Sequence, residues 1–210
     1  MPFRMRPFRM RKAILALEEA DPLLGAVIGQ VGPYRIRYLP PSFDTLVKSI
    51  VFQQLSGRVA GAIFARLREA AGGGELTPEA LLRLPPARMR KLGLSRQKIA
   101  YARGIAAQAL SGELDFGGLR SLSDEEAIRV LTGLKGVGEW TAHMFLIFAL
   151  RRKDVLPAGD LGIQAAVKKL YGLPAMPKPR ELERLGEKWR PWRTVASWYL
   201  WRTLEPDANL

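Results

Sequence analysis

Asp160 stands where a carboxylate could do chemistry, at the expected start of a helix that runs to Tyr171. The helix dipole favours a negative charge at this end of a helix. An ionised carboxylate there can stabilise positive charge that develops on a substrate, or orient and deprotonate a water molecule. It can equally serve only as the N-cap of its own helix, and the residue alone does not decide between these roles.

A glycine-rich turn precedes Asp160 in the stretch Leu131–Ala142, which reads LTGLKGVGEWTA. We expect one helix to end near Leu131 and a second to begin at Glu139. Gly136 and Gly138 can adopt backbone angles closed to other residues and let a partner approach the main chain closely. Free N–H groups at the start of the second helix can bind a phosphate. This pattern is typical of a helix–hairpin–helix, which grips the DNA backbone without reading its sequence.

The same turn has two competing interpretations. Gly136 and Gly138 begin the G-x-G of a dinucleotide-binding loop, but Thr141 stands where the third glycine belongs. A helix rather than a strand also precedes the turn, which argues against that loop. A helical hairpin that binds no ligand is the other interpretation, and the turn by itself leaves it open.

The charge of the chain favours a polyanionic partner. It has 33 Lys and Arg against 20 Asp and Glu, which leaves a formal net charge of +13. Each phosphate that basic residues neutralise releases condensed counterions, so we expect nucleic acid to bind. A solvated basic surface that binds no anion is the alternative.

Composition excludes several kinds of site. Without cysteine the chain has no disulfide, no thiolate zinc site and no iron–sulfur cluster. Its single histidine, His143, argues against a His-based metal centre or a Ser-His-Asp triad. No site for magnesium, flavin or a nucleotide is visible, and we expect no cofactor.

We expect a monomer in the cytoplasm, associated with the nucleoid and not with a membrane. No stretch approaches the roughly 18 apolar residues that a membrane span needs. The N-terminus is rich in arginine and contains a duplication, in which Pro2–Arg6 repeats as Pro7–Arg11. We interpret this segment as a basic tail or an extended start site, because no apolar region of a signal peptide follows it.

Helices must position these residues, because helical periodicity and capping signals dominate. Ser42 and Ser95 are expected N-caps, and Ser123 with Glu126 forms a capping box. The expected helices span about 42–51, 59–71, 78–84, 95–110, 123–131, 139–151, 160–171, 179–185 and 191–204. Only Tyr34–Leu39, between two prolines, alternates like a strand. The fold class that follows is all-α.

The order of hairpin, apolar helix, proline-containing loop and aspartate resembles the helix–hairpin–helix (HhH-GPD) DNA glycosylase superfamily. Within it, the loop Val155–Asp160, which reads VLPAGD, is similar to the catalytic loop of the 3-methyladenine DNA glycosylase II (AlkA-type) branch. The resemblance covers the chain from Ser42 onward. It implies two helical lobes with an active-site cleft between them, a middle lobe of residues 36–143 that holds the hairpin and a second lobe of residues 1–35 with 144–210. The β-rich N-terminal domain of the longest bacterial members has no counterpart here, which leaves the lesion preference open.

The activity that the resemblance implies is base excision repair of alkylated duplex DNA. The enzyme would flip a 3-methyladenine-like or 7-methylguanine-like base out of the stack and hydrolyse its N-glycosidic bond, with Asp160 as the catalytic residue. Members that also nick the strand carry a lysine two residues past the second hairpin glycine, and Trp140 stands there in this chain. Without that amine no Schiff base can form, so we expect a monofunctional enzyme with no lyase activity.

The remaining site residues also follow from the resemblance. Phe52–Ser56 matches the segment that fills the gap left by the flipped base, and Gly93–Lys98 resembles another recurrent turn of the branch. Trp192 and Arg193, with Trp198 and Trp201 after them, match its aromatic C-terminal helix, and the alternative role of each tryptophan is core packing. The expected substrate pocket comprises Trp140, Trp201 and Gln53, where electron-rich rings would attract a positively charged methylated purine. The expected DNA contacts are Lys135, Gly136, Val137, Gly138, Thr141, Gln54 and Leu55.

Two further expectations concern charged groups. Hairpins of this type hold a monovalent cation on backbone carbonyls, here those of Thr132, Leu134 and Val137. Asp154 follows a basic run, and we expect it to pair with Arg151 or Arg152.

Two rival functions remain open. One is a non-catalytic helix–hairpin–helix DNA-binding protein, which would need neither the aspartate nor the tryptophan-rich helix. The other keeps the fold and the chemistry but acts on deaminated or etheno-adducted purines.

Overall fold

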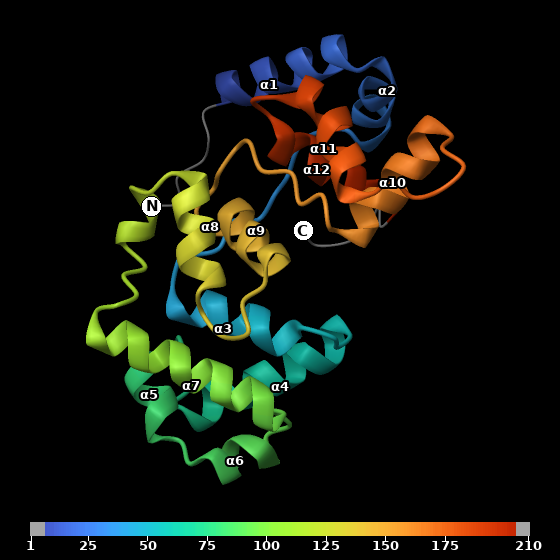
Figure 1. Ribbon diagram of the computed structural model, residues 1–210. Helices are drawn as coiled ribbons and strands as arrows, with labels where there is room; N and C mark the ends of the chain where they lie inside the picture. The colour runs from blue at the N-terminus through green and yellow to red at the C-terminus, as the bar shows by residue number, and fades with distance from the viewer. Residues whose placement is uncertain (1–6, 205–210) are drawn as a thin grey trace. The chain divides into compact units, whose positions relative to one another are not determined.

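The computed structural model describes residues 7–204 and has twelve α-helices and two short 3-10 helices among them (Figure 1). No strand occurs in that range, so the predicted all-α class is confirmed. The α-helices are α1 (Pro7–Ala20), α2 (Pro22–Val31), α3 (Phe43–Phe52), α4 (Gly57–Ala70), α5 (Pro78–Arg83), α6 (Pro86–Lys91), α7 (Arg96–Ser111), α8 (Asp124–Thr132), α9 (Glu139–Phe148), α10 (Leu161–Tyr171), α11 (Pro179–Gly186) and α12 (Arg193–Arg202). The 3-10 helices are η1 (Gly118–Arg120) and η2 (Glu187–Trp189). None of the helices in this range is long and apolar enough to cross a membrane.

The chain divides into two compact units. Unit 1 combines Met1–Tyr38 with Arg151–Leu210, and unit 2 is Leu39–Leu150. The expected boundary after residue 143 differs from this division, because it would cut α9 in two. The helix belongs to unit 2 as a whole, where Phe145 and Leu146 are buried and the Phe145 ring lies 6.3 Å from that of Phe116.

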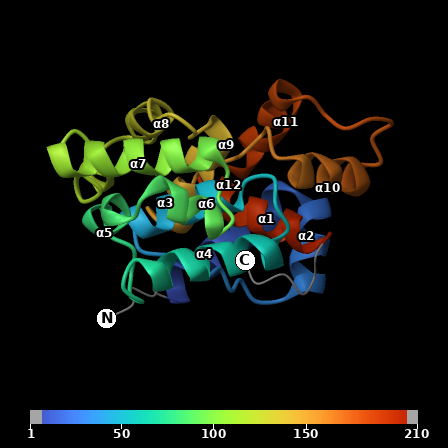
Figure 2. The same cartoon turned by 90° about the horizontal axis from the view of Figure 1, so that it is seen from below.

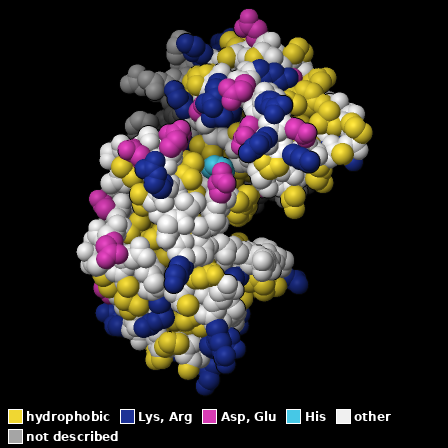
Figure 3. All heavy atoms as spheres, viewed as in Figure 1, with side chains coloured by type: hydrophobic (Ala, Val, Ile, Leu, Met, Phe, Trp, Pro, Cys, Tyr) yellow, Lys and Arg dark blue, Asp and Glu magenta, His cyan; other side chains and the backbone are white. Residues whose placement is uncertain are grey.

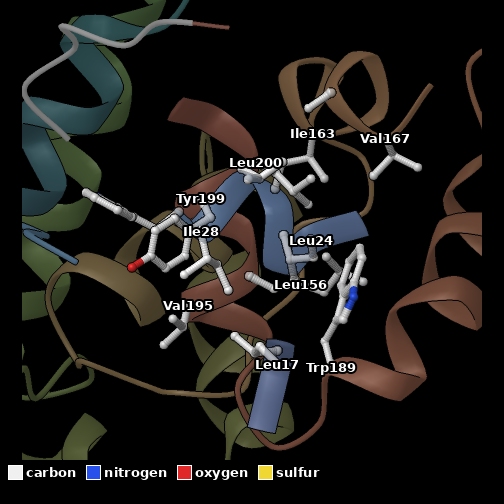
Figure 4. Packing of buried hydrophobic residues seen from close by; sticks show 14 of the residues in the cluster. Leu17, Leu24, Ile28, Leu156, Ile163, Val167, Trp189, Val195, Tyr199 and Leu200 are labelled. Carbon is white, nitrogen blue, oxygen red and sulfur yellow. The ribbon is translucent and has the colours of Figure 1, made fainter. Parts of the chain in front are cut away.

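The core of unit 1 is built around α12. Seven consecutive residues of this helix, from Thr194 to Leu200, are buried, as expected of a helix that is covered on all sides. Trp198 and Tyr199 meet edge to face, with ring centroids 4.9 Å apart. Leu24 and Ile28 of α2 and Ile163 of α10 belong to the same cluster (Figure 4). This packing fixes α10 and α12 relative to one another.

A buried carboxylate ties the ends of several unit 1 segments together. Asp21, which is 1% exposed, caps α2 by accepting from the Leu24 N–H. It also accepts from the Tyr171 hydroxyl, from Trp189 Nε1 at 2.7 Å and from Lys188 Nζ at 3.1 Å. Burial alone would raise the pKa of Asp21, but these hydrogen bonds together outweigh it and hold the pKa below its usual range.

Unit 2 is organised around α7. This helix lies beside α3, α5 and α6 in both views (Figures 1 and 2). The predicted capping signals at Ser42, Ser95 and Ser123 are confirmed, and the Ser123–Glu126 capping box is complete. Ser56 adds a cap at the start of α4.

The segment Tyr34–Leu39 is extended but pairs with no strand in the described range, so the strand prediction was wrong. It crosses from unit 1 to unit 2. Tyr34 and Ile36 pack against the unit 1 core, and this one-sided burial produces the alternation seen in the sequence. Leu39 N donates instead to Phe148 O at 2.8 Å.

Candidate functional site

The turn between α8 and α9 forms the predicted hairpin. Leu134 N donates to Leu131 O, and Val137 N donates to Leu134 O. Gly136 has φ +92, and a Cβ there would lie 2.2 Å from the Cδ2 atom of the Tyr101 ring. A side chain is therefore excluded both by conformation and by contact. Gly138 is different, because its φ of −87 is open to any residue and a Cβ would meet nothing within 4 Å.

Gln53, which is expected in the substrate pocket, holds the hairpin through its side chain, and its place in the pocket stays a prediction. Its Nε2 donates to Gly136 O at 2.9 Å and to Thr141 Oγ1 at 3.2 Å. Thr141, expected to contact DNA, is only 3% exposed, so its hydroxyl is used inside unit 2. Sequence reasoning missed this contact, because the two partners lie more than eighty residues away from Gln53 along the chain.

The other hairpin residues fall into two groups. Lys135 and Gly138 are exposed, whereas the side chains of Val137 and Leu134 are buried.

Of the three carbonyls expected to hold a monovalent cation, that of Leu134 already accepts the Val137 N–H and keeps one lone pair. The cation site stays a prediction. In the part of the chain that is described, no three acidic or histidine side chains are grouped so as to hold a metal ion.

A hollow of about 520 Å³ borders the hairpin within unit 2. Its walls come from the end of α3, the start of α7 and the hairpin turn. The lining residues are Gln53, Gln54, Ser95, Gln97, Lys98, Tyr101 and Thr132 to Gly138. Lysine and amide side chains therefore surround the main chain of the hairpin. Such groups are suited to contact the phosphates of a nucleic acid.

Gln54 and Leu55 belong to the segment that is expected to fill the gap left by the flipped base. They lie at the turn that joins α3 to α4, which we call the plug turn. Gln54 has φ +56, an uncommon angle for a residue other than glycine, and its side chain is exposed. Leu55 is 39% exposed. Both side chains are accessible to a partner.

Asp160 is the N-cap of α10. Its Oδ1 accepts from Ile163 N at 2.8 Å and from Trp201 Nε1 at 2.9 Å. Trp201, expected as a pocket wall, therefore also orients the carboxylate. A Cβ on Gly162 would lie 3.0 Å from Oδ1 and 3.4 Å from Trp201 Cδ1, so the glycine leaves room for this bond. Asp160 therefore does cap α10. This role is compatible with catalysis, because the Asp160 carboxylate stays half-exposed and can be reached by a substrate.

The loop before Asp160 is fastened to the start of α12. Thr194 Oγ1 donates to Arg152 O at 2.7 Å and accepts from Val155 N at 3.0 Å. Thr194 N donates to Lys153 O. Gln164 Nε2 donates to Ala158 O on the other side of the loop.

Asp154 strengthens this attachment through ion pairs. It binds the guanidinium groups of Arg190 and Arg193, each at 2.8 Å. The expected pairing with Arg151 or Arg152 was wrong. Arg151 has φ +61, and its guanidinium lies over the Tyr38 ring, 5.1 Å from the centroid.

The remaining aromatic and charged residues have separate places. Trp198 is 2% exposed and is a core residue, whereas Trp140 is 46% exposed at the start of α9. The Trp192 ring carries Lys153 Nζ at 5.1 Å. On the face shown in Figure 3, Lys and Arg side chains occur over both units and are not confined to one patch. On that face, charge alone does not mark a binding surface.

Comparisons with known proteins identify the family of this chain. Residues 47–191 match the model of the HhH-GPD superfamily of base excision DNA repair proteins. The structure of the Schizosaccharomyces pombe 3-methyladenine DNA glycosylase in complex with abasic DNA has a TM-score of 0.83 and 36% identity, over 91% of this chain and 96% of that one. A DNA-3-methyladenine glycosidase from Bacillus halodurans gives 0.84 and 38%, over 92% and 89%. DNA-3-methyladenine glycosylase 2 of Escherichia coli is 26% identical over 88% of this chain and 68% of its own length. The chain therefore belongs to the HhH-GPD superfamily of base excision DNA repair proteins, in the branch of the 3-methyladenine DNA glycosylases, as its motifs predict.

Proposed function

We propose that the protein is a monofunctional DNA glycosylase that removes alkylated bases such as 3-methyladenine and 7-methylguanine from duplex DNA. The main observation behind this proposal is the Asp160 carboxylate, which Ile163 N and Trp201 Nε1 hold at the start of α10 by hydrogen bonds. Relatives that match most of this chain are named 3-methyladenine glycosylases, and one of them has been solved with abasic DNA.

The reaction places a specific demand on Asp160. As the base leaves, positive charge develops on the sugar, and a nearby carboxylate can stabilise it or orient and deprotonate the attacking water. A carboxylate does this well only if its direction is fixed beforehand. The two hydrogen bonds to Oδ1 supply that fixed direction.

Hydrolysis without strand cleavage follows from the residue at the start of α9. Lyase chemistry of this superfamily needs an amine that forms a Schiff base with the sugar. Trp140 occupies that position and carries no amine. Its exposed ring can instead lie against a cationic methylated purine, a contact that contributes about 0.5–2 kcal/mol.

DNA binding would use the main chain of the hairpin and the plug turn. The N–H groups at the start of α9 can receive a phosphate of the backbone. Gln54 and Leu55 would fill the gap that the extruded base leaves, which lowers the cost of flipping.

Replacing Asp160 by asparagine tests the proposal. Single-turnover excision is measured on duplexes that carry one 7-methylguanine, and alkali then cleaves the abasic sites. We expect wild-type protein to yield breaks only after alkali, and Asp160→Asn to excise at least about 100-fold more slowly. Glu183→Gln, an exposed residue of α11, removes the same charge and should excise at the wild-type rate.

The rival functions give different results in the same assay. A non-catalytic DNA-binding protein would release no base from any duplex, and Asp160→Asn would then change neither activity nor binding. Duplexes with hypoxanthine or ethenoadenine test the other rival, an enzyme for deaminated or etheno-adducted purines. Faster release of these bases than of 7-methylguanine would show that they are the preferred substrates.

A further inference from the structure

The turn Gly93–Lys98 stands out in the sequence, and the chemistry proposed above gives it no task. Ser95 caps α7, and Lys98 lies in the first turn of that helix. The Lys98 side chain leaves α7 and reaches the end of α3. Its Nζ donates to Val51 O and to Gln53 O, both at 2.7 Å.

The Val51 carbonyl lies in the last turn of α3 and the Gln53 carbonyl at its C-cap, where carbonyl groups lack partners within the helix. Gln53 N takes the Ile50 carbonyl, and Leu55 N takes that of Phe52. Lys98 donates to the carbonyls of Val51 and Gln53, which these backbone bonds leave open. A positive charge is favourable at this end of a helix. Burial lowers the pKa of Lys98, and the two carbonyls satisfy donors of its partly buried ammonium.

The residue that Lys98 holds by its carbonyl also holds the hairpin by its side chain. Gln53 Nε2 binds Gly136 O and Thr141 Oγ1, as described above. Gln54, with φ +56, and Leu55 follow directly. Three segments of unit 2 therefore meet at Gln53: the start of α7, the hairpin and the plug turn.

We propose that Lys98 is a positioning residue, which fixes the Gln54–Leu55 plug turn to the hairpin so that both engage the same DNA during base extrusion. The inference rests on the proposed function. It assigns Lys98 an indirect task, since its hydrogen bonds run to the protein main chain and it acts through Gln53 and the plug turn.

Lys98→Met tests this inference, because it keeps an unbranched side chain of nearly the same length and removes the ammonium. We expect single-turnover excision to fall about 10- to 50-fold, since small misplacement of a positioning element has effects of this size. The preference for abasic over undamaged duplex should fall by a similar factor. Affinity for undamaged duplex should fall less than about threefold, the effect of losing one distant cation. Lys91→Met in α6 is the matched control and should leave all three quantities unchanged.

A double-mutant cycle with Leu55→Ala separates positioning from a general structural role. If Lys98 acts through the plug turn, the double variant should be no slower than the slower single variant. A merely structural lysine would lower the melting temperature and the affinity for undamaged duplex, and its effect would multiply with that of Leu55→Ala. Should Lys98→Met fail to fold, Lys98→Gln takes its place in the cycle, because it keeps a polar side chain but removes the ammonium and is shorter.

The possible failures are distinguishable. If wild-type protein excises no alkylated base, the proposed function is wrong, and the preference for abasic duplex still tests Lys98. If wild-type protein excises and Lys98→Met matches it, or the two effects multiply, the positioning role is wrong.

Discussion

The two units hold their functional groups by opposite means. Unit 1 presents a side chain, and Asp160 is held by another side chain, Trp201, which projects from a helix buried on nearly every side. Unit 2 presents main chain, and the hairpin is held by side chains that bond to or press on its backbone. Gln53 binds the Gly136 carbonyl, and the Tyr101 ring covers the Gly136 Cα.

The difference matches what each group has to do. A carboxylate that must face a reacting sugar needs a fixed side-chain direction, which hydrogen bonds and a buried scaffold provide. A phosphate clamp needs correctly aimed N–H groups and no base-reading side chain, so its anchors act on the backbone. Each of the following predictions tests one side of this comparison.

The largest effect is expected at Gly136. Gly136→Ala combines a left-handed φ with a Cβ 2.2 Å from the Tyr101 ring, and together these should cost about 3 kcal/mol. Hydrogen exchange in peptides covering residues 131–142 should accelerate, and affinity for undamaged duplex should fall. Gly138→Ala is the control and should cost less than about 1 kcal/mol, because that position is open and adopts an ordinary φ. Equal exchange in the two variants would show that the backbone anchors are unimportant.

A smaller effect is expected at the buried carboxylate of unit 1. Asp21→Asn replaces an acceptor of several hydrogen bonds by an amide that must present N–H groups to donors, at a cost of about 2 kcal/mol at neutral pH. Because the folded pKa is lowered, the stability that Asp21 contributes is present above the unfolded pKa and is lost as pH falls through the folded pKa.

Urea unfolding between pH 3 and 7 measures this contribution. The wild-type protein should lose stability on the acid side, and the difference from Asp21→Asn should narrow there. Asp115→Asn, an exposed carboxylate of unit 2, should change stability by less than about 0.5 kcal/mol. A constant difference across the pH range would mean that Asp21 stabilises unit 1 through shape and not through charge.

Local signals in the sequence predicted much of this arrangement. The caps at Ser42, Ser95 and Ser123 and the glycine turn at 136–138 are short patterns with a direct physical cause. Helix α2 could have been found in the same way, since Asp21 and Pro22 form an N-cap followed by proline at the first helical position.

Contacts between distant parts of the chain could not be predicted. Nothing local shows that Gln53 meets Gly136 or that Lys98 meets the end of α3. Asp154 shows the reverse error. A basic run precedes it in the sequence, but its ion-pair partners are Arg190, just before α12, and Arg193, the first residue of that helix.

The smallest and most specific effect is expected at Trp201. Trp201→Phe keeps an aromatic ring but removes the N–H that binds Asp160 Oδ1, while the capping bond from Ile163 N remains. Loss of one hydrogen bond to a charged group should slow single-turnover excision about tenfold and leave DNA affinity and stability nearly unchanged. Trp198→Phe is the matched control on the same helix, because its indole nitrogen makes no hydrogen bond within the described residues and its ring fills the core. That variant should lose stability and keep its excision rate per folded molecule. If both variants slowed excision equally, Trp201 would act by packing, and the orientation of Asp160 by a side-chain hydrogen bond would lose its support.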